Sequence, residues 1–198
     1  MSPADRRCRS AHPWTGAAVL RGAKVGLRAR HDNDVMTLQA GLYDDVATRV
    51  RADSRPWRPI PPSPDASPYR VSEPADDVAF FSVVDLADGD RLAGEALLWG
   101  IDAHNRTAHL GISLLPQFRG RALGSDVVRV LCHYGFGLRG MHRLQVDTLV
   151  DNEAMVRAAT RAGFTQEGVL RRAAWVDGAF VDEVVLGLLA EEWRNDAG

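Results

Sequence analysis

The segment from Leu110 to Gly124 carries the residue types that bind an anion. An apolar run ends at Pro116, a turn rich in glycine and arginine follows, and a helical pattern begins directly after it. The first turn of a helix has unpaired N–H groups and the positive end of the helix dipole. Small residues at three positions let an anion approach the backbone, and Arg119 and Arg121 add charge. The same spacing also fits an ordinary strand-to-helix turn with solvated arginines.

Two other phosphate-binding motifs fail on this sequence. A P-loop requires Gly-Lys-Ser/Thr after its glycines, and the only lysine, Lys24, lies far upstream. A dinucleotide fingerprint requires Gly-x-Gly-x-x-Gly in a parallel unit, with an acidic residue about twenty positions further on. Asp147 lies near that distance, but the first glycine is replaced and the predicted order of strands is wrong for that fold. The turn therefore belongs to another type of fold.

The periodicity of apolar residues predicts the strands and helices that position this turn. Alternation predicts strands over 20–28, 78–86, 92–101, 107–115, 143–150, 164–176 and 180–189. Spacings of three and four, together with capping residues, predict helices from Asp32 onward and over 44–50, 123–138 and 152–162. Between Pro56 and Pro74 lie seven of the ten prolines, which predicts a long extended loop.

Composition excludes several classes of function. The chain has 198 residues, 45% of them hydrophobic and 25% charged, which suits a single domain with its own core. With 24 basic and 26 acidic residues, the net charge of -2 gives no field that would attract nucleic acid or an anionic membrane. Cys8 and Cys132 are too few and too far apart for a disulfide framework or a zinc site, so no metal is expected.

The N-terminal residues do not resemble a targeting signal. Met1–Trp14 carries charges without an apolar segment, and no apolar run approaches the roughly 18 residues that a membrane span needs. We therefore expect a protein of a reducing, cytoplasmic compartment that binds neither a membrane nor nucleic acid. Residues 1–16 are polar, basic and interrupted by prolines, which predicts a disordered extension before a domain over 17–198.

Four motifs occur in an order that is typical of one family. Gln117-Phe118-Arg119-Gly120-Arg121-Ala122 fits Gln/Arg-x-x-Gly-x-Gly/Ala, and Asn152 opens a helix that ends in Ala162-Gly163-Phe164. A closing hairpin around Trp175-Val176-Asp177-Gly178 and an opening strand over 20–28 complete the set. In these features the chain resembles the GCN5-related N-acetyltransferase (GNAT) superfamily, and within it the bacterial group that acetylates ribosomal-protein N-termini.

The resemblance covers roughly Leu20 to Trp193 and implies both a fold and a co-substrate. The fold would be a single α/β (α+β) domain with a mixed, mostly antiparallel central sheet of about seven strands and helices on both faces. The co-substrate would be acetyl-CoA or another acyl-CoA, with its pantetheine along 111–115 where that strand diverges from 143–150. The residues implied to bind it are Ser113, Leu114, Leu115, Gln117, Arg119, Gly120, Arg121, Ala122, Leu123, Gly124 and Asn152. A backbone N–H near Leu114 would stabilise the oxyanion.

Two residues are candidates for the base that takes a proton from the attacking amine. His109 takes the strand position where relatives often carry Glu, and imidazoles titrate close to neutral pH. The same residue also fits a solvent-facing strand histidine. Glu95 lies among apolar residues of the neighbouring strand, where a carboxylate needs water, a structural partner or a function.

The family's usual hydroxyl near the thioester sulfur is missing from this chain. Met155 stands at that position and cannot donate a proton, so we assign no general acid. The thiolate then leaves unassisted, or with help from water or another residue. The departure also leaves succinyl or another acyl group open as the group transferred.

The sequence predicts an enzyme that moves an acyl group, in the first place acetyl, from acyl-CoA to a primary amine by direct attack in a ternary complex. A non-catalytic or regulatory acyl-CoA-binding module is an alternative, and a partner-binding protein that uses the proline-rich loop is another. The acceptor stays open between a small-molecule amine, an aminoglycoside and a peptide N-terminus. Acidic residues near the loop are compatible with a basic acceptor; they are Asp65, Glu73, Asp76 and Asp77. Whether the chain forms a homodimer is also left open.

Overall fold

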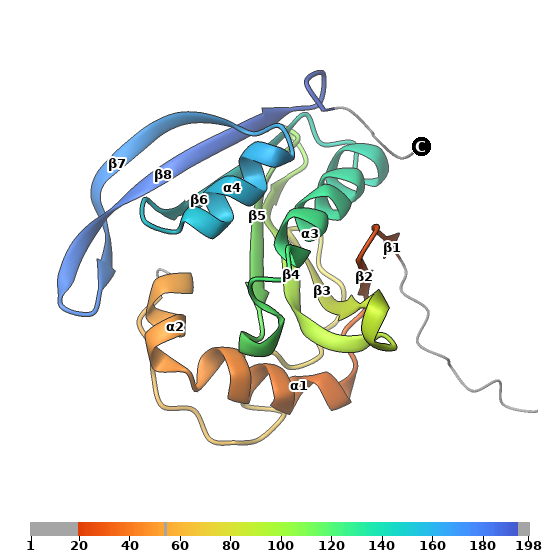
Figure 1. The fold of residues 1–198 in the computed structure, drawn as a ribbon, viewed down its shortest axis with the longest axis vertical. Coiled ribbons are helices and arrows are strands. Elements are labelled where there is room, and N and C mark those ends of the chain that lie inside the picture. Colours follow the sequence, from red (N-terminus) through yellow and green to blue (C-terminus); the bar gives the residue numbers. More distant parts are fainter. Residues whose placement is uncertain (1–19, 54, 194–198) are drawn as a thin grey trace, which may run out of the picture.

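A computed structural model describes residues 20–53 and 55–193, which form one eight-stranded sheet flanked by helices (Figure 1). The strands are β1 (Leu20–Arg21), β2 (Val25–Arg28), β3 (Val78–Asp85), β4 (Arg91–Asp102), β5 (Thr107–Leu114), β6 (Arg143–Leu149), β7 (Thr165–Val176) and β8 (Ala179–Leu189). The α-helices are α1 (Asp32–Leu38), α2 (Val46–Ala52), α3 (Leu123–Cys132) and α4 (Glu153–Arg161). The predicted disordered extension over 1–16 lies outside the described residues.

The sheet is mixed and mostly antiparallel, as the sequence predicted. Its order is β1-β2-β3-β4-β5-β6-β8-β7, and β5–β6 is the parallel pair among these strands. The predicted single strand over 20–28 is in fact two short strands, which brings the count to eight. The chain turns between them because the Asp126 carboxylate of α3 accepts hydrogen bonds from the backbone N–H groups of residues 23–25.

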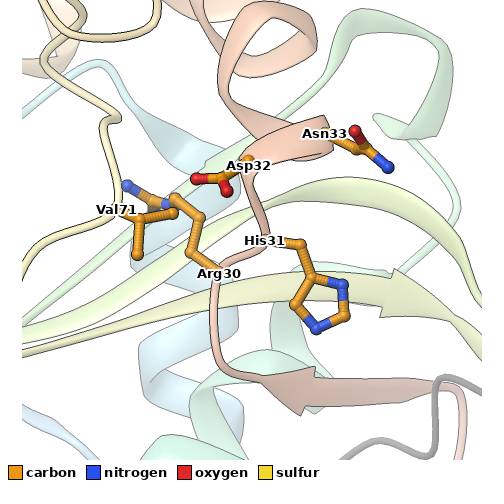
Figure 2. Close-up of a pocket in the computed structure, with 5 residues that line it drawn as sticks. All are labelled: Arg30, His31, Asp32, Asn33 and Val71. Carbon is orange, nitrogen blue, oxygen red and sulfur yellow. The ribbon is translucent and has the colours of Figure 1, made fainter. Parts of the chain in front are cut away.

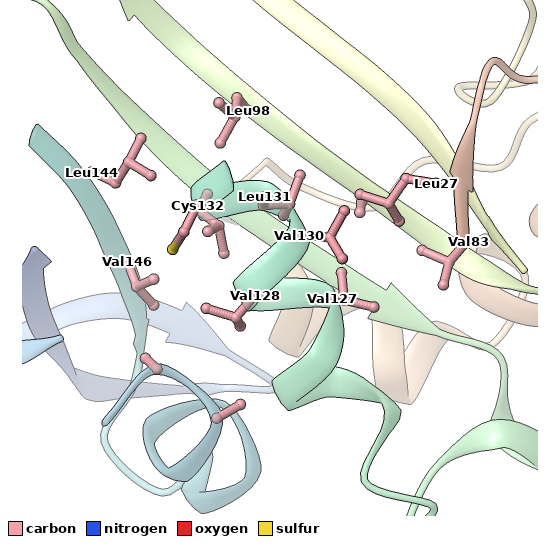
Figure 3. Close-up of a cluster of buried hydrophobic side chains, with 14 of the residues drawn as sticks. Leu27, Val83, Leu98, Val127, Val128, Val130, Leu131, Cys132, Leu144 and Val146 are labelled. Carbon is pink, nitrogen blue, oxygen red and sulfur yellow. The ribbon is translucent and has the colours of Figure 1, made fainter. Parts of the chain in front are cut away.

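Helices cover both faces of the sheet, as expected. Val83 of β3 belongs to the core around α3 (Figure 3), whereas Ser82, the preceding residue, donates a hydrogen bond to Asp34 of α1 at 2.8 Å. Because successive side chains of a strand point to opposite faces, α1 and α3 lie on opposite sides of the sheet. The predicted hairpin between 78 and 101 and the closing hairpin β7–β8 are also present.

The core centres on α3, whose apolar side packs on the sheet beside α4 (Figure 3). The buried apolar residues of this helix are Leu123, Val127, Val128, Val130, Leu131 and Cys132. Each large apolar side chain buried in this way contributes about 1.5–3 kcal/mol. The predicted helix over 123–138 is α-helical only to Cys132 and continues as a π-helical segment over His133–Leu138. No helix within 20–53 and 55–193 is long and apolar enough to cross a membrane.

The proline-rich segment between α2 and β3 is extended and irregular in its described residues, as its composition predicted. It is bound by hydrogen bonds to Tyr43, the last residue of a π-helical segment over Gln39–Tyr43 that continues α1. The Tyr43 hydroxyl donates to the Arg58 carbonyl at 2.8 Å, and the Trp57 indole donates to the Tyr43 carbonyl at 3.2 Å. Tyr69 is buried among the core residues. The segment therefore forms a fixed wall on the α1 side of the sheet.

Candidate active site

Strands β5 and β6 separate soon after they meet, which opens the sheet at its centre. They pair only at Thr107–Arg143, Ala108–Leu144 and His109–Gln145. Beyond those pairs β5 continues to Leu114 and β6 to Leu149 without pairing to each other. The predicted divergence of the two strands is present, and His109 stands at its apex.

Beyond the apex, β5 presents free backbone groups to the gap. The Leu115 N–H donates to the Ala93 carbonyl of the β4 side at 2.9 Å. Hydrogen-bonded pairs alternate along an antiparallel ladder, so the odd-numbered residues of β5 bond to β4. The N–H and C=O groups of Ile112 and Leu114 therefore point to the side of β6, where no strand pairs with them. An extended molecule can bond to this edge as a further strand does.

The turn after β5 is open and directs its backbone to solvent. A short 3-10 turn over Pro116–Phe118 leads to Gly120 (φ 73°) and Ala122 (φ 58°), and α3 begins at the next residue. A Cβ atom built at Gly120 or Gly124 would meet no atom within 4 Å. A non-glycine residue in the left-handed region is strained by about 1–3 kcal/mol, which is common at ligand-binding turns. The geometry fits a group that carries phosphates.

The two arginines of this turn are already in contact with the protein. Arg121 forms an ion pair with buried Asp85 at 2.8 Å and lies over the Phe118 ring. Arg119 donates from Nε to the Leu114 carbonyl at 2.9 Å and from Nη1 to the Thr48 hydroxyl at 3.4 Å. The Arg121 charge is therefore balanced by Asp85, which the sequence alone did not indicate. Arg119 is exposed and occupies the free edge of β5.

The other residues expected to bind acyl-CoA fall into two groups. Ser113, Gln117 and Asn152 are at least partly exposed around the gap, the turn and the start of α4. Leu115 and Leu123 are buried in the core, so their side chains serve packing.

Asn152 caps α4 and also reaches into the gap-forming strand β6. Its Oδ1 accepts from the Met155 N–H at 3.3 Å, and its Nδ2 donates to the Thr148 hydroxyl at 2.9 Å. These contacts fit the expected role of Asn152 in orienting helix α4. Met155, which stands at the family's hydroxyl position, is half-buried and packs against the core.

Helix α2 lies on the α1 side of the gap and contacts both of its edges. Thr48 meets Arg119 after the end of β5, and Val50 packs against the small cluster formed by Leu149 at the end of β6 with Ala174 and Val176 of β7. At the same end, Arg51 pairs with Asp151 at 2.6 Å. The gap is thus bordered by α2 on one side of the sheet and by the start of α3 on the other.

His109 is paired with Asp147 of β6 across the apex of the gap. Nδ1 of His109 and Oδ2 of Asp147 are 2.7 Å apart, and the Gln145 amide donates to Oδ1 of Asp147 at 2.8 Å. Burial alone would raise the pKa of Asp147, but the hydrogen bonds from His109 and Gln145 outweigh it and the pKa is lowered. The carboxylate is therefore ionised at neutral pH and can accept a hydrogen bond from Nδ1–H; in the neutral imidazole that has this hydrogen bond, the lone pair is on Nε2.

Glu95, the second candidate base, lies on the same sheet face as His109 but in a different environment. Its Oε2 accepts from Arg30 at 2.6 Å in a buried ion pair. Burial raises the pKa of Glu95, and the Arg30 charge opposes that rise. His109 pairs with Trp99 of β4, four residues from Glu95, which is about 13 Å along the strand. The two candidates therefore lie at different points along the gap, His109 at its apex and Glu95 opposite Ser113 of β5.

An open pocket of about 490 Å³ lies at the start of α1 (Figure 2). It is lined by Arg30, His31, Asp32, Asn33 and Val71. Arg30 links this pocket to Glu95, since the same guanidinium pairs with that carboxylate. Among residues 20–53 and 55–193, no group of three or more His, Cys, Asp or Glu side chains is arranged to hold a metal ion.

Comparison with known proteins agrees with this architecture. The family model for the acetyltransferase (GNAT) domain matches residues 24–165. The putative ribosomal N-acetyltransferase YdaF of Bacillus subtilis is 32% identical over 111 residues, which is 56% of this chain and 60% of that protein. The chain thus spans about 60% of the length of the first curated relatives that it matches.

Solved structures share the fold. A crystal structure of a probable acetyltransferase superimposes with a TM-score of 0.71 at 21% identity, covering 86% of this chain and 96% of the other. The spermidine N-acetyltransferase of Vibrio cholerae in complex with CoA and spermine gives 0.66 at 18% identity, covering 85% and 96%. A divided central sheet with an open turn at a helix start defines the GNAT class. The chain belongs to the GNAT acetyltransferase family.

Proposed function

We propose that the protein is a CoA-dependent N-acyltransferase that moves an acyl group, in the first place acetyl, from acyl-CoA to a primary amine. One observation carries the proposal: the edge of β5 that faces the gap leads through the short turn over Pro116–Phe118 into the open turn at the start of α3. An extended pantetheine and a pyrophosphate are joined in the same order in CoA. The family membership of the chain supports the same assignment.

The residues that would hold acyl-CoA follow from these backbone groups. The N–H and C=O groups of Ile112 and Leu114 would bond to the pantetheine, and the N–H groups of 119–124 would bond to the pyrophosphate. Arg119 would release the Leu114 carbonyl and turn toward the phosphates, because its side chain is exposed and held by neutral partners. The bound thioester supplies an activated acyl group, and the acyl-CoA N-acyltransferase domain would extend over 17–198.

His109 is the base that we favour. Asp147 fixes the ring with Nε2 free, and the ring lies at the apex of the gap. In the transfer, the amine nitrogen bonds to the acyl carbon, the carbon–sulfur bond breaks, its electron pair leaves with sulfur, and Nε2 takes the proton of the amine. Glu95 remains the alternative, although Arg30 already occupies its carboxylate. With Met155 near the gap, the thiolate leaves without a hydroxyl from that position.

Turnover is the test that separates this function from its alternatives. Acetyl-CoA and succinyl-CoA should each be tried with a panel of primary amines, and free CoA thiol should be measured. Release of CoA that depends on the amine supports the enzyme. A rise in thermal stability with CoA but no turnover with any amine would favour a non-catalytic acyl-CoA-binding module. Failure of every CoA species to bind would overturn both.

The setting that we propose is the cytoplasm of a bacterium, supported by the bacterial source of the first relative and by the chain's charge balance. The acceptor would be a small-molecule amine or a peptide N-terminus. Sedimentation of the full chain with and without CoA would establish whether it forms a homodimer.

A further inference from the structure

Asp85 connects the segment between β3 and β4 to the open turn at the start of α3. It is the last residue of β3, its side chain is 1% exposed, and its Oδ1 accepts from the Ala87 N–H at 3.0 Å. Its Oδ2 lies 2.8 Å from Nη2 of Arg121. The pair lacks the alignment of a hydrogen bond, so the attraction between the two charges holds it together.

The two arginines of the open turn are held in different ways. Among the described residues, Arg121 is the basic residue that pairs with Asp85. Removing the partner of a buried charge is strongly unfavourable, so Arg121 cannot leave Asp85 at low cost. Arg119 is held by the Leu114 carbonyl and the Thr48 hydroxyl, which carry no charge. Arg119 can therefore turn to a phosphate, whereas Arg121 stays on Asp85.

Arg121 stands in the strained part of the turn. It lies between Gly120 and Ala122, whose φ angles are 73° and 58°. A residue with a Cβ atom keeps this left-handed conformation where the surrounding structure imposes it. A Cβ atom built at Gly120 would meet no atom within 4 Å, so packing at that position does not impose it. The Arg121 side chain does have fixed contacts, with Asp85 and with the Phe118 ring.

Phe118 is the common support of two ion pairs. Its ring is fully buried, and its centroid lies 5.3 Å from Cζ of Arg121 and 4.8 Å from Cζ of Arg91. Arg91 pairs with Asp88 at 2.7 Å, so each arginine has an acidic partner near the β3–β4 connection. The Asp88 side chain is 40% exposed, and exposed ion pairs contribute little to stability. Of the two pairs, the one with buried Asp85 is therefore suited to fix the turn.

We propose that Asp85 is a positioning residue for acyl-CoA: through Arg121 it holds the backbone of 120–122 in the form that presents its N–H groups to the pyrophosphate. The inference rests on the proposed function and gives a role to a residue outside the turn. A turn that is fixed before the ligand arrives loses less conformational freedom on binding. Arg121 then acts on affinity through Asp85, while backbone N–H groups and Arg119 meet the phosphate charge.

The experiment measures the affinity of the full chain for CoA by calorimetry, and KM and kcat for acetyl-CoA. Asp85→Asn keeps the shape of the side chain and the acceptor for the Ala87 N–H, but it removes the charge that holds Arg121. We expect CoA to bind about tenfold more weakly, which corresponds to the strain of one left-handed residue. KM for acetyl-CoA should rise while kcat is unchanged. Asp88→Asn is the matched control, because it breaks the exposed pair beside the same ring and should bind CoA as the wild type does.

Two further substitutions separate positioning from direct contact and from a general loss of stability. Arg121→Gln should add no further loss of affinity in the Asp85→Asn background. Ala122→Gly in that background should restore part of the affinity, because glycine adopts the left-handed conformation without strain. If Asp85→Asn does not fold, Arg121→Gln takes its place, with the same expected loss and the same partial recovery by Ala122→Gly.

Four results would overturn the inference while leaving the proposed function intact. Equal affinity of Asp85→Asn and the wild type would mean that the pair does not prepare the turn. Tighter binding by Asp85→Asn would mean that Asp85 withholds Arg121 from the phosphates. A further loss with Arg121→Gln would make Arg121 a direct ligand, and no recovery with Ala122→Gly would make the effect one of stability. Absence of CoA binding by the wild type would overturn the proposed function and the inference with it.

Discussion

Nδ1 of His109 lies 2.7 Å from Oδ2 of Asp147, and this contact joins β5 to β6 where the two strands begin to separate. The two residues are 38 positions apart in the chain. The contact defines both the orientation of the imidazole and the place where the sheet opens. It therefore connects the architecture of the sheet to the proposed chemistry of the gap.

The first prediction concerns Asp147 as a positioning residue. Asp147→Asn keeps the size of the side chain but can donate to Nδ1, so the hydrogen of the ring can move to Nε2 and block the base. We expect kcat to fall about a hundredfold, the low end for loss of base catalysis, while the affinity for CoA is unchanged. Steady-state kinetics and calorimetry measure the two quantities. Asp88→Asn, at an exposed ion pair with Arg91, should behave as wild type; equal kcat in both variants would exclude the positioning role.

A second prediction separates backbone strain from ligand contact at the open turn. Gly120 and Gly178 both have positive φ (73° and 87°), and neither has an atom within 4 Å of a built Cβ. Gly120→Ala and Gly178→Ala should each lower the free energy of unfolding by about 1–2 kcal/mol. Only Gly120→Ala should weaken CoA binding. If both variants bind CoA alike, the turn is not where the phosphates lie.

A third prediction concerns acid stability and Asp34. Burial would raise the pKa of Asp34, but hydrogen bonds from Arg28, the His31 N–H and Ser82 lower it below the ordinary 3.8. A carboxyl group whose pKa is lower in the folded than in the unfolded protein stabilises the fold at pH values above its unfolded pKa, here the ordinary 3.8. That stabilisation is lost as the pH falls from 3.8 through the lower pKa of the folded protein.

Asp34→Asn should therefore lower the free energy of unfolding by about 3 kcal/mol at pH 7, because Arg28 loses its buried partner. The difference from wild type should shrink as pH is lowered. Urea titrations between about pH 3 and 7 measure both effects. Asp32→Asn on the exposed side of α1 is the control. A constant difference at all pH values would show that the ionised form of Asp34 is not the stabilising one.

A fourth prediction concerns the attachment of the first two strands. Asp126 accepts from the N–H groups of Ala23, Lys24 and Val25 at 3.2, 2.7 and 3.0 Å. Asp126→Ala leaves these donors without their partner and should lower the free energy of unfolding by about 3 kcal/mol. Asp126→Asn keeps one acceptor oxygen and should lose less. Equal stability of Asp126→Ala and wild type would mean that water replaces the carboxylate at no cost.

Much of the fold was predictable because local chemistry determined it. The alternation over 143–150 and the turn at Asp177-Gly178 identified β6 and the closing hairpin. The end of α3 was not predictable, because the apolar spacing continues through its π-helical segment. There Gly135 packs so closely on β6 that a Cβ atom would lie 2.9 Å from the Leu144 side chain. Tertiary contact, not periodicity, determined that change.

Only part of the site was predicted, because some of its residues come together through tertiary contacts. The strand–turn–helix order located the open turn, and a family pattern drew attention to His109. Asp147 was recognised only as an acidic residue that did not complete a dinucleotide motif. The alternation places Gln145 and Asp147 on one strand face, but it does not say which strand lies beside them. That partner and its register arise from the parallel pairing of β5 with β6.

The three-residue ladder between β5 and β6 also has a consequence for how the molecule unfolds. Strands β1–β5 form one antiparallel group and β6–β8 another, and this ladder is the backbone connection between the two groups in the sheet. Cooperative units in proteins often coincide with such groups. The amides of Ala108, Arg143 and Gln145, which point across this ladder, should therefore exchange hydrogen together, in an opening of lower free energy than global unfolding. A ligand that bonds to both strands along the gap would then raise the free energy of this opening and slow the exchange.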